Sequence, residues 1–196
     1  MNPKKSLKSL VVSQTRLKLI KEFFTFPKEA FYIRELTRKT VEKINSVRRE
    51  LINLEEVGIL YSERRGNRLF YIPNSHHPLF YPLLLMANKS FGLGYDLQKN
   101  KARLGNIKLA LFSTRFMRWE SVDNEVDILI IGRVVLPEIG EIIRHEEKRR
   151  DREINYAVLS LDEYKMRVTN KDPFIIDFLL KAPAVIIGSE EDLYNI

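Results

Sequence analysis

Three acidic residues lie where two predicted strands begin. Glu125-Val126-Asp127 opens an apolar strand over residues 126–131, and the two-residue period of a strand puts Glu125 and Asp127 on one face. Glu153 opens the next predicted strand. Carboxylates in such an arrangement can hold Mg²⁺ for phosphoryl transfer. Glu125, Asp127 and Glu153 are therefore candidate catalytic residues, with Glu125 and Asp127 as candidate metal ligands. The spacing leaves open that these carboxylates only cap a strand or pair with arginines.

A second group of residues is suited to contact nucleic acid. Ile44, Val47, Leu51 and Leu54 recur at intervals of three and four, which predicts a helix with one stripe facing a core. Asparagine can bond adenine, arginine can bond guanine or phosphate, and a recognition helix makes such contacts mainly from its N-terminal half. The polar residues expected to face outward on this helix, with Arg48 at the flank of the stripe, are Asn45, Ser46, Arg48, Arg49 and Asn53.

The sequence also predicts the elements that position this helix. A short helix with an apolar entry is predicted over residues 31–40, and Gly58 follows the apolar stripe where a helix commonly ends. Two strands are predicted at residues 59–61 and 69–72, joined by the turn signal Gly66-Asn67. The hairpin tip carries Arg64, Arg65 and Arg68, which suit phosphate or minor-groove contacts. The order of elements predicts a winged helix-turn-helix that binds double-stranded DNA.

Charge is distributed unevenly between the two halves. Residues 1–100 carry 18 Lys and Arg against 9 Asp and Glu, a balance of +9, and residues 101–196 carry 15 against 17, a balance of −2, which together give the net charge of +7. A polyanionic partner is therefore expected at the first half. The apolar runs are far shorter than a membrane span, no signal peptide is recognised, and the chain has no cysteine. We expect a cytoplasmic protein with no membrane partner.

The remaining pattern predicts two domains of an α+β protein. A helix is expected over residues 10–26, and an apolar helix over residues 79–91 that could pack on its own domain or pair two subunits. The expected organisation is a winged helix-turn-helix domain with its trailing apolar helix at 1–91, a linker region at 92–104 that starts at Gly92-Leu93-Gly94, and a small mixed α/β domain at 105–196. A homodimer would suit paired DNA half-sites.

Strands and helices alternate in the second half. The strands are predicted at residues 107–112, 126–131, 154–160 and 185–187, and the helices at residues 136–149, 161–169 and 173–181.

Nearly the whole chain resembles a known family. Residues 10–91 are similar to the winged-helix half, and residues 105–193 to the catalytic half, of prokaryotic proteins that join a winged helix-turn-helix to a minimal nucleotidyltransferase domain of the DNA polymerase beta superfamily. The catalytic pattern of that family has an apolar strand, Gly-Ser, a loop, and an Asp-x-Asp pair. The segments that carry the resemblance are Phe31 to Leu36, Ile44 to Leu51, Arg65-Gly66-Asn67, Phe70-Tyr71, Leu111 to Thr114, Glu125-Val126-Asp127, Glu153-Ile154-Asn155, Asp172-Pro173-Phe174 and Ile186-Ile187-Gly188.

The departures from the family pattern concern its chemistry. The resemblance implies that Ser113 and Thr114 occupy the nucleotide-binding position, but Ser113 replaces a glycine and adds a Cβ where phosphate must approach closely. Glu125 is one methylene longer than aspartate, which the narrow geometry of Mg²⁺ disfavours. Bulky residues from Phe116 to Trp119 occupy a loop that is small in the family. We therefore expect an inactive transferase domain that serves assembly or ligand sensing, with Mg²⁺ and a nucleotide as ligands only if binding is retained.

These observations favour a sequence-specific DNA-binding transcriptional regulator. Two alternatives stay open at the level of sequence. The first is an active Mg²⁺-dependent nucleotidyltransferase that acts on protein or RNA, and the second is an antitoxin-like module that binds a protein partner.

Overall fold

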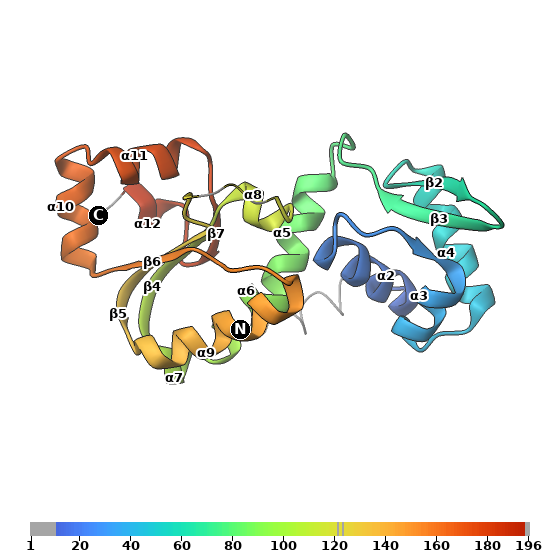
Figure 1. The fold of residues 1–196 in the computed structure, drawn as a ribbon, viewed down its shortest axis with the longest axis horizontal. Helices are drawn as coiled ribbons and strands as arrows, with labels where there is room; N and C mark the ends of the chain where they lie inside the picture. The colour runs from blue at the N-terminus through green and yellow to red at the C-terminus, as the bar shows by residue number, and fades with distance from the viewer. Residues whose placement is uncertain (1–10, 121, 123, 195–196) are drawn as a thin grey trace. The chain divides into compact units, whose positions relative to one another are not determined.

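The chain is a mixed α+β protein with two small sheets. The computed structural model describes residues 11–120, 122 and 124–194, and it divides into two compact units, Met1–Phe91 and Gly92–Ile196 (Figure 1). No helix among the described residues combines the length and the apolar character needed to cross a membrane.

The described part of unit 1, residues 11–91, combines four helices with a three-stranded antiparallel sheet. Strand β3 lies in the middle of the sheet, with β1 on one side and β2 on the other, so the order is β1-β3-β2. The elements follow the chain as α2 (Gln14–Thr25), β1 (Phe31–Tyr32), α3 (Ile33–Thr40), α4 (Ile44–Glu56), β2 (Leu60–Arg65), β3 (Arg68–Pro73) and α5 (Phe80–Ser90).

Helices α2 and α4 of unit 1 each bury an apolar stripe. Helix α2 begins at Ser13, whose hydroxyl accepts the Arg16 N–H at 3.2 Å, and its stripe is buried. In α4, the predicted core residues Val47, Leu51 and Leu54 are buried as expected. Ile44 was also predicted to face the core, but it is 37% exposed because it occupies the first turn of α4, at the edge of the stripe.

The β2–β3 hairpin closes with a two-residue turn. Arg65 pairs with Arg68, so Gly66 and Asn67 are the two central residues. Gly66 has a φ of 59° and Asn67 has a negative φ, as in a type II′ turn with glycine first. The predicted turn is therefore present, and it holds both arginines at the tip of the hairpin.

Unit 2 contains a four-stranded mixed sheet with the order β6-β5-β4-β7. Strand β4 is antiparallel to β5 and to β7, whereas β5 and β6 are parallel. The elements follow the chain as α6 (Gly92–Lys99), α7 (Lys101–Leu104), β4 (Gly105–Phe112), α8 (Thr114–Met117), β5 (Ile128–Val134), α9 (Leu136–Arg150), β6 (Tyr156–Leu159), α10 (Leu161–Thr169), α11 (Pro173–Leu180), β7 (Ala184–Ile187) and α12 (Glu191–Tyr194).

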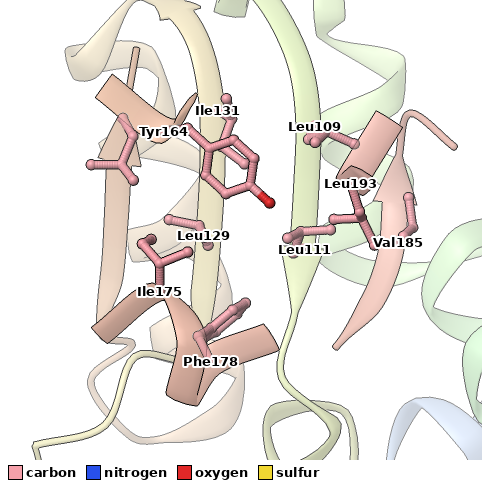
Figure 2. Close-up of a cluster of buried hydrophobic side chains, with 10 residues drawn as sticks. Leu109, Leu111, Leu129, Ile131, Tyr164, Ile175, Phe178, Val185 and Leu193 are labelled. Atoms are coloured by element: carbon pink, nitrogen blue, oxygen red, sulfur yellow. The ribbon is translucent and has the colours of Figure 1, made fainter. Parts of the chain in front are cut away.

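Side chains alternate between the two faces of this sheet and both faces are covered. Leu109 and Leu111 of β4 and Leu129 and Ile131 of β5 point to one face. They belong to one cluster of buried side chains, to which α10, α11 and α12 also contribute and which includes Tyr164 (Figure 2). Helices α6, α7 and α9 pack against one another and lie on the other face (Figure 1).

The segment at residues 92–104 differs from its prediction. The sequence predicts a linker there, but the segment forms helices α6 and α7, with Leu93, Leu97 and Leu104 buried within unit 2. The two glycines suggested a flexible joint. Gly92 does take a positive φ of 62°, but the apolar residues that follow it have a core to pack against, and burial outweighs the low helix propensity of glycine.

Candidate nucleic-acid interface and acidic centre

The outward face of α4 carries polar and basic side chains. Asn45, Arg48 and Arg49 are exposed, and the Arg48 guanidinium donates to the Asn45 side-chain oxygen at 3.3 Å. Ser46 and Asn53 were predicted on the same face, but both are half-buried because they lie at the flank of α4 next to the buried Glu50. Among the polar residues predicted to face outward on α4, the exposed ones are therefore Asn45, Arg48 and Arg49. The apolar Ile52 lies next to them and is 43% exposed.

Helix α2 fixes the turn that leads into α4. The Lys18 ammonium donates to the Thr40 carbonyl at 2.9 Å and to the Glu42 carboxylate at 2.6 Å, and the Thr15 hydroxyl donates to the same carboxylate at 3.2 Å. The hydrogen bond from Lys18 lowers the pKa of Glu42 below its ordinary value. Between the two helices, Val41 takes a left-handed conformation with a φ of 56°. The ion pair between Lys18 and Glu42 and the left-handed turn at Val41 together fix the position of the start of α4.

A second anchor lies in the middle of α4. The Glu50 side chain is buried, and its carboxylate accepts the Ser13 hydroxyl at 2.7 Å and the Arg16 Nε–H at 2.8 Å. Burial alone would raise the pKa of Glu50, but the hydrogen bonds from Ser13 and Arg16 hold it below its ordinary value. Glu55 one turn later accepts the Ser62 hydroxyl at 2.5 Å, which ties α4 to strand β2.

The hairpin tip exposes all three predicted arginines, Arg64, Arg65 and Arg68. The Arg65 guanidinium lies 5.2 Å from the centre of the Phe70 ring and also pairs with Glu63, and the Arg68 guanidinium lies 4.8 Å from the centre of the Tyr32 ring. The aromatic faces hold both guanidinium groups in place without neutralising them, while the pair with Glu63 offsets part of the charge of Arg65. We call these three arginines and their turn the wing.

A groove of about 1110 Å³ lies between α3, α4 and the wing. Its walls include the exposed Arg34 and Arg38 of α3, which the sequence interpretation did not single out. Arg38 also donates to the Tyr32 hydroxyl at 3.3 Å. The i, i+4 spacing of Arg34 and Arg38 on a predicted helix was the available signal, because that spacing puts both side chains on one face. The arginines that border the groove are Arg34, Arg38, Arg48 and Arg68.

The acidic residues of unit 2 are engaged by cations. Asp127 immediately precedes β5 and is 7% exposed. Each of its two carboxylate oxygens accepts a hydrogen bond from one terminal nitrogen of Arg152, both at 3.1 Å. The Asn155 N–H donates to the same carboxylate at 3.2 Å. This bidentate arrangement directs both carboxylate oxygens toward Arg152.

Glu125 and Glu153 also depart from the predicted metal centre. The Glu125 carboxylate pairs with Arg115 and with the Lys181 ammonium, the latter at 3.1 Å. Glu153 is exposed and, like Glu125, lies before its strand rather than in it. Among the described residues, no group of three histidine, cysteine or acidic side chains is placed to hold a metal ion. Glu125, Asp127 and Glu153 therefore do not form the predicted three-carboxylate centre.

The hydroxyls of Ser113 and Thr114 are used locally. The Ser113 hydroxyl accepts the Phe116 N–H at 3.1 Å and starts the short helix α8, while the Thr114 hydroxyl donates to the Ala182 carbonyl at 3.1 Å. The cavity beside Ser113, bordered by Arg115, Glu125 and Lys181, measures about 90 Å³. Pockets for small ligands measure roughly 300–1,000 Å³, so this cavity is too small for a nucleotide.

Bulky side chains fill the space next to this centre. Phe116 is fully buried and contacts Phe112 with ring centres 5.1 Å apart. The Arg150 guanidinium stacks 3.8 Å from the centre of the Phe116 ring and donates to the Phe116 carbonyl at 2.7 Å. Burial lowers the pKa of Arg150 to about 10, an effect that the neighbouring Glu146 carboxylate opposes. Loop residues that are small in the resembled family are thus part of a packed core here.

Comparisons with protein-family models, with curated proteins and with solved structures give no match to the chain.

Proposed function

We propose that the chain is a DNA-binding transcriptional regulator that holds duplex DNA with the outward face of α4 and with the wing. The observation that carries the proposal is the set of exposed side chains Asn45, Arg48 and Arg49 on a helix that Glu42 and Glu50 anchor from behind. A recognition surface must present its donors in a fixed geometry, because ordering side chains at the moment of binding costs affinity. The anchors supply that geometry.

The order of elements supports a winged helix-turn-helix. Two helices, α3 and α4, are joined by a short turn and followed by a hairpin whose central strand β3 also pairs with β1. In such a domain the second helix enters the major groove, and the hairpin contacts the flanking backbone or minor groove. The groove between α3, α4 and the wing would then receive a sugar-phosphate strand, with Arg34, Arg38 and Arg68 as phosphate contacts.

We infer that unit 2 has a nucleotidyltransferase-like fold without turnover, so that the chain would join the two halves of the family it resembles. Ser113 follows strand β4, Asp127 precedes β5 and Glu153 precedes β6, which is the order of segments that the resemblance implies. The pairing of Asp127 with Arg152 and of Glu125 with Arg115 argues against a metal-dependent transferase. Unit 2 would then serve assembly or ligand sensing.

The proposed homodimer would place two α4 helices on paired half-sites. Its test is sedimentation of the full chain with and without duplex DNA. A two-to-one complex on a site with two half-sites supports it, and a one-to-one complex on every duplex contradicts it.

The DNA-binding proposal is tested by fluorescence anisotropy with labelled duplex DNA, first of random sequence at low salt and then of a sequence selected from a random pool. The variant R48A/R49A is expected to bind the selected duplex about 100-fold more weakly, since each lost base or phosphate contact costs roughly 1–3 kcal/mol. The matched control is Arg144→Ala, which removes an exposed arginine of α9. Equal affinities for the wild type and R48A/R49A, or no binding at low salt, would overturn the proposal.

A further inference from the structure

A second cavity in unit 2 lies at the other end of strand β4 from Ser113. It measures about 440 Å³, within the range of cavities that bind small molecules. Three lysines from separate elements border it, namely Lys101 of α7, Lys108 of β4 and Lys165 of α10. No feature of the proposed DNA interface or of the acidic centre uses these residues.

The backbone explains why a hollow forms there. Strand β4 changes register between Ile107 and Leu109, and its pairing with β7 starts only at Ala110 opposite Ile187. Beyond that pair, the chain turns at Gly188, which has a φ of 92°. A Cβ at Gly188 would lie 2.5 Å from the Leu109 side chain and 2.8 Å from the Lys108 carbonyl. Glycine therefore allows the two segments to approach each other at one wall of the cavity.

The charges around the cavity are unbalanced. All three lysines are exposed, and none of them forms an ion pair within the part of the chain that the structure describes. The one acidic residue of the lining, Asp192, accepts the Ser189 N–H at 2.7 Å and the Ser189 hydroxyl at 2.8 Å. Those hydrogen bonds lower the pKa of Asp192, so its carboxylate stays ionised. Three ammonium groups and one carboxylate leave two positive charges in excess.

We propose that this cavity binds a small organic phosphate. A phosphate monoester carries a charge of roughly −1.5 to −2 near neutral pH and presents three oxygens, which matches the excess charge and the three lysines that line the cavity from separate elements. The organic part of the ligand would contact the apolar floor, to which Ile107, Leu109 and Leu161 contribute. A carboxylic acid of the same size matches the floor but supplies only half the charge.

The test is calorimetric titration of the full chain with phenyl phosphate, inorganic phosphate and benzoate at low ionic strength. Phenyl phosphate is expected to bind tightest, with a Kd of about 1 mM or below, because it alone has both the charge and the apolar body. The double variant K108Q/K165Q is expected to weaken that binding about tenfold, since it removes two partly solvated ion pairs. Lys148→Gln, at an exposed position on α9, serves as the control.

Several outcomes separate this proposal from its competitors. Binding of phenyl phosphate that weakens below about pH 6, where the second phosphate proton is taken up, supports it. Equal affinities for phenyl phosphate and benzoate, an equal loss in Lys148→Gln, or no saturable binding of any probe overturns it. A larger effect of K108Q/K165Q on short duplex DNA than on phenyl phosphate also overturns it, because the lysines would then belong to a DNA surface. Failure of these titrations leaves the R48A/R49A experiment untouched, since that experiment concerns unit 1.

Discussion

Arginines have opposite roles in the proposed DNA interface of unit 1 and in the acidic centre of unit 2. In unit 1, Arg49 and Arg64 are exposed, and neither has an acidic partner among the residues that the structure describes. In unit 2, Arg152 is bound to both oxygens of Asp127, and Arg115 is paired with Glu125. A solvent-exposed, unpaired guanidinium can bind phosphate and release counterions. A guanidinium that is paired with a nearly buried carboxylate instead contributes to the stability of the fold.

The acidic residues of the two units also differ in their role. The acidic side chains of unit 1, Glu42 and Glu50, pair behind α4 with residues of α2, so they anchor the helix and leave its front basic. In unit 2, Asp127 and Glu125 lie where the sequence predicts metal ligands, and they pair with Arg152 and Lys181 instead. The basic front of α4 is therefore free to bind a ligand, whereas the charged residues of the acidic centre stabilise the fold of unit 2.

The largest expected effect comes from breaking the pair in unit 2. Arg152→Ala would leave the carboxylate of Asp127 nearly buried with only the Asn155 N–H as donor, which should destabilise unit 2 by about 3 kcal/mol. Hydrogen exchange of the β5 and β6 amides measures this loss. The added substitution Asp127→Asn should recover part of it, because it removes the uncompensated charge. A fully stable Arg152→Ala variant would show that the pair is not structural.

Removing the wing arginines should weaken DNA binding without affecting the fold. The variant R64A/R65A/R68A is expected to lose about 100-fold in affinity at low salt, because three phosphate or minor-groove contacts disappear. Anisotropy titrations against the wild type measure this change, and Arg144→Ala is again the control. A loss confined to R48A/R49A, with the wing variant unchanged, would limit the interface to α4.

The anchor behind α4 gives a smaller effect on stability that depends on pH. Since the folded-state pKa of Glu50 is depressed, its contribution is complete above the unfolded-state value of about 4.5 and is lost as the pH falls through the lower folded-state value. Glu50→Ala should cost about 2 kcal/mol at neutral pH, through the hydrogen bonds of Ser13 and Arg16. Thermal unfolding between pH 3 and 7 measures both quantities.

Glu56→Ala, at an exposed position of the same helix, is the control for this prediction. It should leave the stability and its pH dependence unchanged. If Glu50→Ala unfolds with the same pH dependence as the wild type, the ion pair with Arg16 does not contribute in the way described.

The smallest expected effect concerns sequence preference. Asn45→Ala should reduce affinity for a selected duplex about fivefold, or roughly 1 kcal/mol, and change affinity for random duplex much less, because an amide reads a base edge rather than a phosphate. The ratio of the two affinities is the measurement. An equal loss on both duplexes would assign Asn45 to the backbone or to its contact with Arg48.

Local patterns predicted the helices and strands well, because apolar spacing determines which face of an element is buried. Val47 and Leu51 illustrate this on α4, and Leu109 and Leu129 on the sheet of unit 2. The errors arose at the ends of elements and in short segments. Ile44 lies in a first turn where the core no longer covers the stripe, and the segment that begins at Gly92 became helical because a partner surface was available.

The interaction partners of the candidate site residues could not be predicted from their spacing in the sequence. Arg152 lies 25 positions from Asp127, and Lys181 lies 56 positions from Glu125, so only the folded sheet brings each pair together. Sequence indicated the two carboxylates and left open that arginines pair with them, but it did not indicate which cations engage them. The same holds for Glu50. A helical wheel places it at the flank of the apolar stripe, as it does Arg48, and does not indicate that Glu50 is buried or that Ser13 and Arg16 would satisfy it.

The most direct test of DNA binding by unit 1 is the dependence of duplex affinity on salt concentration. For the wild type, the logarithm of the association constant should fall linearly with the logarithm of salt concentration. The variant that lacks Arg48, Arg49, Arg64, Arg65 and Arg68 should flatten the slope by about 4.5 if all five meet phosphates, at roughly 0.9 per contact. A wild-type affinity that is independent of salt, or a slope that the five substitutions leave unchanged, would contradict the account.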